Sequence, residues 1–140
     1  MDKARAQGFA FFTDPELEYF LFEADRNGEP VPLDRSSYFD LTTSDVVSNI
    51  RRKTLTTLEA MGIPVEYSFH EDAPSQYEID LRYTDALTMA DNVMTFRLIV
   101  REIALEHGVH ATFMPKPLSG VQGSGTVSYT HLTLPTTPYE

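Results

Sequence analysis

The fold is decided by one alternating stretch, Glu16-Leu17-Glu18-Tyr19-Phe20-Leu21-Phe22. Successive side chains of a strand point to opposite faces, so this stretch predicts a strand with Leu17, Tyr19 and Leu21 on one face. The other face then carries two glutamates about 7 Å apart, close enough to ligate one or two cations between them. The alternative is a solvated pair. Two phenylalanines on the same face indicate that it is covered, and unpaired buried carboxylates are costly there.

The segments around this strand are predicted to be turns and loops. Residues 8–12 form an apolar run that Thr13-Asp14-Pro15 interrupts with turn chemistry, so the strand is expected to begin at Glu16. Residues 25–30 are typical of a turn, and the proline, aspartate and serine residues up to Asp40 favour a loop.

Two amphipathic helices follow from the spacing of apolar residues. The first begins at Thr43-Ser44-Asp45, which offer N-cap side chains, and ends at Met61 before a glycine. The second covers about residues 84–107. At 100° per residue the first helix has one apolar face, formed by Val46, Val47, Ile50, Thr54, Leu58 and Met61.

Three further strands complete the predicted sheet. Residues 65–71 and 76–83 both alternate, and Asp72-Ala73-Pro74-Ser75 between them is typical of a turn, so they form a hairpin. The last strand covers residues 110–114. We therefore predict an α+β fold: an antiparallel sheet that carries glutamates on its concave face, with the two amphipathic helices packed on the other side.

A second pair of glutamates flanks the hairpin turn. Glu71 and Glu78 lie near one end of the paired strands. If they converge with Glu16 and Glu18, the four carboxylates provide the oxygen ligands that a pair of Mg²⁺ or Mn²⁺ ions requires. The alternative is that Glu71 and Glu78 are surface residues beside a turn.

Composition narrows the class of protein. The 140 residues contain 11 basic and 21 acidic side chains, for a net charge of −10, which makes nucleic-acid binding a poor expectation. The chain has no cysteine, so a disulfide framework and a thiolate zinc site are excluded. Apolar runs fall far below the roughly 20 residues of a membrane span, and the start lacks the apolar region of a signal peptide. We expect a cytoplasmic protein with no membrane partner.

Four successive motifs carry a family resemblance. They are residues 16–22, Tyr38-Phe39-Asp40, residues 70–79, and residues 112–117 continuing to Gly123-Ser124-Gly125. In order and spacing they resemble glutamine synthetase of the bacterial type I class, over about residues 8–125. The resemblance implies that residues 1–125 are a partial catalytic domain. It also implies an ATP-dependent reaction in which glutamate is phosphorylated and ammonia displaces phosphate to give glutamine, in a homo-oligomer.

The resemblance also implies roles for individual residues. Glu18, Glu71 and Glu78 match the ligands of one divalent ion, and Glu16 matches a ligand of a second. The remaining matches are Glu66 and Tyr83 at the nucleotide, Tyr38 near the ammonium pocket, and Gln122 with Gly123 at glutamate, where Gln122 replaces the usual Asn. Strict alternation places Glu66 and Glu71 on opposite faces, so both serve one site only if a bulge or the strand end intervenes.

The resemblance stops after Gly125. The family continues with Met-His-x-His, whereas Thr126-Val127-Ser128-Tyr129 follows here, and residues 126–140 show no periodicity. We interpret residues 126–140 as a non-family tail, adapter-derived or disordered, which the sequence pattern does not place as a packed element. The later arginines and another metal-ligating glutamate of the family are also missing, so we expect this polypeptide alone to be inactive. The alternatives are a γ-glutamyl ligase that uses an organic amine, and a non-catalytic fragment that keeps only the fold.

Overall fold

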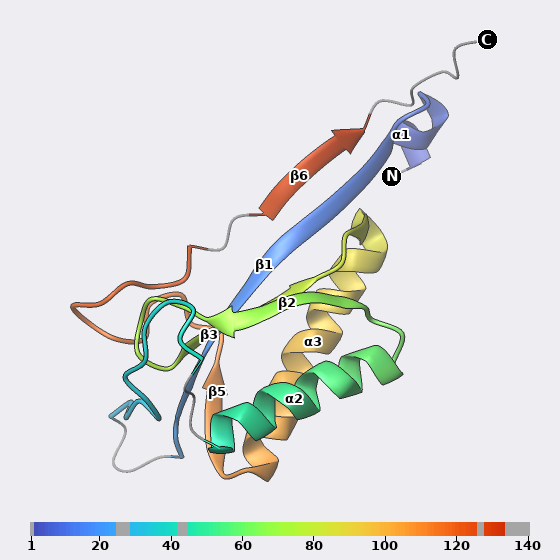
Figure 1. Cartoon of the computed structure of the whole chain (residues 1–140). Coiled ribbons are helices and arrows are strands. Elements are labelled where there is room, and N and C mark those ends of the chain that lie inside the picture. Colours follow the sequence, from blue (N-terminus) through green and yellow to red (C-terminus); the bar gives the residue numbers. More distant parts are fainter. Residues whose placement is uncertain (1, 25–28, 42–44, 126–127, 134–140) are drawn as a thin grey trace.

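The computed structural model describes residues 2–24, 29–41, 45–125 and 128–133. These residues contain one six-stranded sheet whose paired strands are all antiparallel. Its strands are β1 (Ala10–Glu23), β2 (Val65–His70), β3 (Gln76–Leu81), β4 (Thr84–Asp85), β5 (Val109–Thr112) and β6 (Ser128–Thr133). The helices are α1 (Asp2–Ala6), α2 (Asp45–Ala60) and α3 (Ala86–Glu106). Figure 1 shows α1 beyond the far end of β1, apart from α2 and α3.

The long strand β1 organises the sheet. β3 pairs with residues 16–20 of β1, and β5 pairs with residues 20–23. Since Phe20 pairs with both, β3 and β5 lie on opposite sides of β1. β2 pairs with the outer edge of β3, which confirms the predicted hairpin. In this register Glu18 lies directly opposite Glu78, and Glu16 lies opposite Asp80.

The predicted break at Thr13-Asp14-Pro15 is wrong, because β1 runs through it without interruption from Ala10. Pro15 has no N–H to donate to a ladder, and it occupies a place where this costs little. It is the last β1 residue paired with β6, and pairing with β3 begins at Glu16. Turn-forming composition is therefore overridden by the two ladders that meet at this residue.

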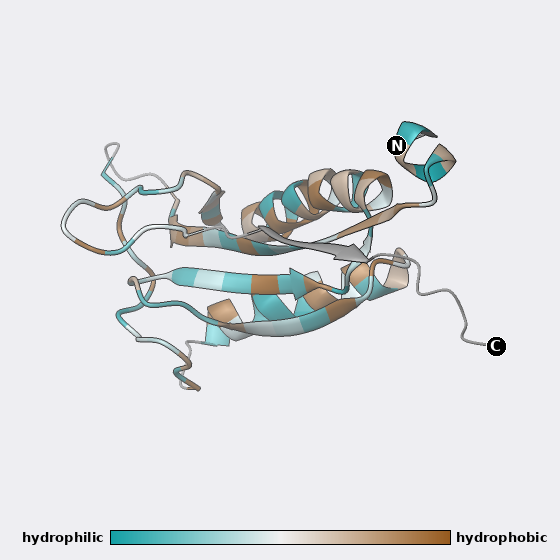
Figure 2. Ribbon diagram, turned by 90° about the horizontal axis from the view of Figure 1, so that it is seen from above, coloured by the Kyte–Doolittle hydropathy of each residue, from teal (hydrophilic) through white to brown (hydrophobic). Residues whose placement is uncertain are grey.

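The two faces of β1 follow the predicted alternation. Leu17, Tyr19 and Leu21 are buried in the main core with side chains of α2 and α3. Phe20 and Phe22 form a separate small cluster with Ala73 on the other face. Both helices thus cover one side of the sheet, as predicted, and each shows hydrophilic and hydrophobic segments in Figure 2.

Several local predictions need correction. Val46 and Met61 are exposed, because α2 buries a narrower stripe and ends at Ala60. In β2 the buried residue is His70, whereas Tyr67 is exposed, since the register of β2 shifts between Val65 and Tyr67. Tyr83 lies beyond the end of β3 and is exposed.

Residues 128–133, which show no periodicity in the sequence, form strand β6, which pairs with residues 10–15 of β1. The interpretation of residues 126–140 as a non-family tail stays a prediction. The N-terminal half of β1 offers an edge beyond the ladder with β5, and β6 occupies it. None of the helices in the described residues is long and apolar enough to cross a membrane.

Candidate metal centre

Three of the four predicted glutamates meet in space. Glu18, Glu71 and Glu78 each place one carboxylate oxygen within 4.8 Å of the others. Glu18 and Glu78 are cross-strand partners on β1 and β3, so their side chains share one face. Glu71 is the first residue after β2, and its N–H donates to the Gln76 carbonyl, which closes the hairpin at 2.8 Å. The strand end brings this third carboxylate round to the same face.

Glu18 is held by two hydrogen bonds. The Gln76 side-chain amide donates to one oxygen at 2.5 Å, and the Gly125 N–H donates to the other at 2.8 Å. Burial raises the pKa of Glu18 to about 7, and the nearby charges of Glu71 and Glu16 add to the rise. Close to neutral pH the carboxylate is therefore only partly ionised while no cation is present.

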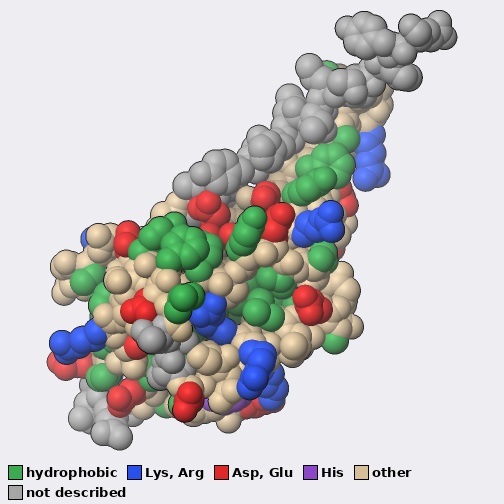
Figure 3. Space-filling view, viewed as in Figure 1, with side chains coloured by type: hydrophobic (Ala, Val, Ile, Leu, Met, Phe, Trp, Pro, Cys, Tyr) green, Lys and Arg blue, Asp and Glu red, His purple; other side chains and the backbone are tan. Residues whose placement is uncertain are grey.

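Glu78 and Asp80 of β3 form a hydrogen-bonded carboxylate pair. Burial raises the pKa of Glu78 to about 10, and its hydrogen bonds with Asp80 and Glu71 add to the rise. Burial also raises the pKa of Asp80, and the charges of Glu16 and two other acids act in the same direction. One buried oxygen of Asp80, Oδ1, has no hydrogen-bond partner among the described residues. Acidic groups whose burial disfavours the ionised form are thus concentrated on β1 and β3. Figure 3 shows further acidic side chains exposed on the face that it draws.

Glu16 stands beside this group rather than in it. It lies opposite Asp80 across the β1–β3 ladder. With Glu18 and Arg97 it lines a small cavity of about 200 Å³. Glu16 therefore shares this cavity with Glu18, whereas neither Glu71 nor Glu78 lines it.

The donor set fits a hard divalent cation. Three carboxylates that converge within a few ångströms are stabilised by Mg²⁺ or Mn²⁺, which prefer oxygen ligands. The residues present can thus hold such an ion.

The predicted nucleotide residues lie at the sheet's margin. Glu66 is the extra residue where the β2 register shifts, so a bulge intervenes as the alternation argument required. The Glu66 side chain is exposed, and its negative charge contributes to the raised pKa of Asp80. Tyr83 is exposed, and its ring meets Phe12 edge-on at 6.0 Å between centroids.

Tyr38 lies close enough to Glu71 and Glu78 for their charges to act on it. Desolvation and the charges of Glu71 and Glu78 raise the pKa of Tyr38. Its exposed ring packs edge-on against Phe39 at 4.5 Å and Phe69 at 6.0 Å between centroids. The loop before α2 therefore reaches the acidic group.

The glycine-containing loop after β5 folds back on itself. The Ser124 N–H donates to the Pro115 carbonyl at 2.7 Å. A Cβ at Gly123 would lie 2.5 Å from the same Pro115 oxygen, so only glycine fits this close approach. Gln122 is exposed in this loop. This folding delivers the Gly125 N–H to Glu18.

Sequence reasoning missed a buried polar network behind Glu71. His70 and Asp34 are 36 residues apart, and His70 Nε2 lies 2.9 Å from Asp34 Oδ1. Burial lowers the pKa of His70, but hydrogen bonds to Asp34 and to the Glu71 carbonyl outweigh it and leave that pKa raised. For Asp34, burial is likewise outweighed, by hydrogen bonds from His70 and Tyr77, which leave its pKa lowered. The only sequence signal was an aspartate in a segment read as loop.

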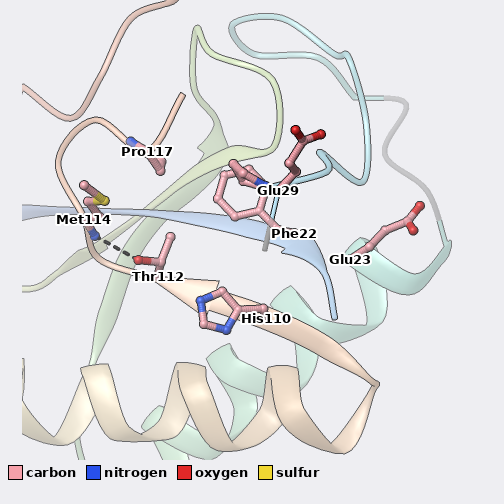
Figure 4. A pocket seen from close by; sticks show the side chains of 8 residues that line it. Phe22, Glu23, Glu29, His110, Thr112, Met114 and Pro117 are labelled. Atoms are coloured by element: carbon pink, nitrogen blue, oxygen red, sulfur yellow. Dashed lines mark hydrogen bonds between the residues drawn. The ribbon is translucent and has the colours of Figure 1, made fainter. Parts of the chain in front are cut away.

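A larger cavity of about 510 Å³ lies elsewhere, at the C-terminal end of β1. Phe22, Glu23, His110 and Thr112 line it, together with prolines of two loops (Figure 4). None of the four converging or neighbouring glutamates lines this cavity.

Comparison with known proteins identifies the family of this chain. A family model described as "Glutamine synthetase, catalytic domain" matches residues 1–136. The chain belongs to this family. The match runs past residue 125, where the sequence predicts the family domain to end, and that boundary stays a prediction.

Relatives within the glutamine synthetase family are similar over most of the chain. It is 48% identical over 136 residues to glutamine synthetase of Mycobacterium tuberculosis strain H37Rv, which covers 96% of this chain and 30% of the relative. It is 50% identical over 124 residues to glutamine synthetase of Clostridium saccharobutylicum, and this match covers 87% of this chain and 28% of the relative. The chain thus spans about 30% of the length of such relatives.

Solved structures share the fold. A structure described as a GmaS/ADP complex has a TM-score of 0.82 and 26% identity, covering 96% of this chain and 32% of that one. A structure of Plasmodium falciparum glutamine synthetase has a TM-score of 0.76 and 25% identity, covering 95% and 32%. These similarities confirm both the family and the antiparallel α+β architecture predicted from the sequence.

Proposed function

We propose that Glu18, Glu71 and Glu78 hold a divalent cation, Mg²⁺ or Mn²⁺, in a glutamine synthetase active site. The convergence of their oxygens within 4.8 Å carries the proposal. The raised pKa values of Glu18 and Glu78 support it, because buried carboxylates with no cation are poorly stabilised as anions. Glu16, on the same side of the sheet, is proposed as a ligand of a second ion nearer the nucleotide.

The parent protein is proposed to join ammonia to the side-chain carboxylate of glutamate at the expense of ATP, through a γ-glutamyl phosphate. Triphosphate and carboxylate repel each other, and bound divalent ions supply the positive charge that lets them approach. The residues of this chain would fix that arrangement from a rigid sheet, which favours alignment of the reacting groups. A structural neighbour described as an ADP complex supports a nucleotide on this fold.

Further residues are proposed at the substrates. Tyr38 stands beside the carboxylates and would border the ammonium pocket. Gln122 and Gly123 lie in the loop that reaches Glu18 and would contact glutamate. Glu66 and Tyr83, both exposed, would contact ATP. We propose a cytoplasmic homo-oligomer as the whole protein, and an inactive polypeptide when these 140 residues stand alone.

A calorimetric titration of the 140-residue chain with Mn²⁺ tests the metal site. We expect saturable binding that Glu71→Gln weakens at least about tenfold, because a ligand carboxylate is lost. Glu102→Gln is the matched control, since Glu102 is an exposed glutamate of α3 outside the group. No binding by the unmodified chain, or equal binding by the Glu71→Gln variant, would contradict the proposal.

A further inference from the structure

We propose that Asp34 and His70 are positioning residues. They hold Glu71 in place for the cation and do not contact the cation themselves. This inference rests on the proposed metal site and adds a second layer of residues behind it. It stands on a set of hydrogen bonds that joins the loop before α2 to the hairpin turn between β2 and β3.

His70 is the buried centre of this set. Its side chain is fully enclosed at the end of β2, and its ring stands edge-on to Tyr77 at 4.9 Å between centroids. Nδ1 lies 2.5 Å from the carbonyl oxygen of Glu71, and Nε2 lies 2.9 Å from Asp34. Both ring nitrogens are therefore used, so the ring is committed to orienting its neighbour rather than to ligating an ion.

Asp34 connects His70 to the turn. Its Oδ1 also accepts from the Ser75 N–H at 3.1 Å, and its Oδ2 accepts from the Tyr77 hydroxyl. Its own N–H donates to Ser75 Oγ at 2.9 Å. One aspartate thus binds the end of β2, the turn and β3 at once, with only about a tenth of its side chain exposed.

These bonds fix the backbone on both sides of Glu71. The Glu71 carbonyl faces His70, while its N–H donates to Gln76. The His70 carbonyl in turn accepts from Phe39 at 3.0 Å, which ties the Tyr38 loop to the same point. Gln76 continues the chain of contacts to Glu18. Residues behind metal ligands that orient them are worth about 10–100-fold in metal affinity.

The test measures Mn²⁺ dissociation constants of the 140-residue chain by calorimetry, at a temperature where each variant is folded by its amide NMR spectrum. Asp34→Asn keeps the size of the side chain but cannot accept at both oxygens. His70→Phe keeps the ring but removes both nitrogens. We expect each to weaken Mn²⁺ binding about 10–100-fold. Thr54→Val, which removes a buried hydroxyl bonded to Ile50 within α2, is the control and should leave the constant unchanged.

A double variant separates positioning from general destabilisation. If Asp34 acts through Glu71, then Asp34→Asn combined with Glu71→Gln binds Mn²⁺ no more weakly than Glu71→Gln alone. If His70→Phe fails to fold, the Asp34→Asn series decides.

Two results would overturn the inference, and they distinguish failure of the positioning role from failure of the metal site. A Glu71→Gln variant that loses affinity beside an Asp34→Asn variant that keeps it contradicts the positioning role alone. A chain in which Glu71→Gln changes nothing contradicts the metal site and this inference together.

Discussion

The N–H of Gly125 donates a 2.8 Å hydrogen bond to Glu18 Oε1, joining two residues that are 107 positions apart. Glu18 lies in the middle of β1, and Gly125 belongs to the loop that follows β5. The loop is held in its returning path by the bond from Ser124 to the Pro115 carbonyl. The cluster of Glu18, Glu71 and Glu78 is thus bordered by this loop as well as by the sheet.

The first prediction concerns the close approach in this loop. Gly123→Ala would place a Cβ 2.5 Å from a backbone oxygen of Pro115, so the loop must move and the Gly125–Glu18 bond is disturbed. We expect a loss of about 1–3 kcal/mol in the free energy of unfolding. Gly125→Ala is the control, because its Cβ meets nothing within 4 Å. Denaturant unfolding of both variants checks this, and equal stability of the two would contradict it.

The second prediction is a pH dependence of the metal-free chain. The pKa of Glu18 is raised from 4.5 to about 7, and that of Glu78 to about 10. Between pH 4.5 and these values the folded chain binds more protons than the unfolded chain, so its stability falls as pH rises. We expect the unfolding temperature without metal to decrease by several degrees from pH 5 to pH 8.

Two comparisons identify the carboxylates as the cause. Glu78→Gln should flatten the decrease, since the variant has no proton to lose there. Saturating Mn²⁺ should remove it, because the metal binds the ionised carboxylates and binds them more tightly as pH rises. An unfolding temperature of the metal-free chain that stays constant or rises from pH 5 to pH 8 is the opposing result.

The third prediction compares two buried tyrosines. Both are fully enclosed, but the Tyr19 hydroxyl has no hydrogen-bond partner within the described part of the chain, whereas Tyr77 donates to Asp34. Tyr19→Phe should therefore leave stability unchanged or raise it by up to about 1 kcal/mol. Tyr77→Phe should lower it by about 1–3 kcal/mol, since Asp34 loses a partner. Thermal unfolding measures both, and a reversed order would show that these contacts are misassigned.

The sequence predicted what depends on local periodicity. Alternation in residues 16–22 placed Leu17 and Tyr19 in the core and the glutamates opposite them, and the hairpin turn placed Glu71 near Glu78. Each of these features needs only the two-residue repeat of a strand and one short turn.

The rest depends on contacts between distant segments. Pro15 continues a strand because two ladders meet there, which no local propensity reveals. The bulge at Glu66 is a register shift against β3, and the Asp34–His70 contact spans 36 residues. Strand β6 likewise pairs with β1, a segment far from it in the sequence.

The central claim is that Glu18 of β1, Glu78 of β3 and Glu71, the first residue after β2, hold one divalent ion. Anomalous diffraction from crystals of the chain grown with Mn²⁺ tests this most directly. We predict a metal peak bonded to carboxylate oxygens of Glu18, Glu71 and Glu78. A structure with bound Mn²⁺ only at other carboxylates, or with these three turned away from one another, would contradict the claim.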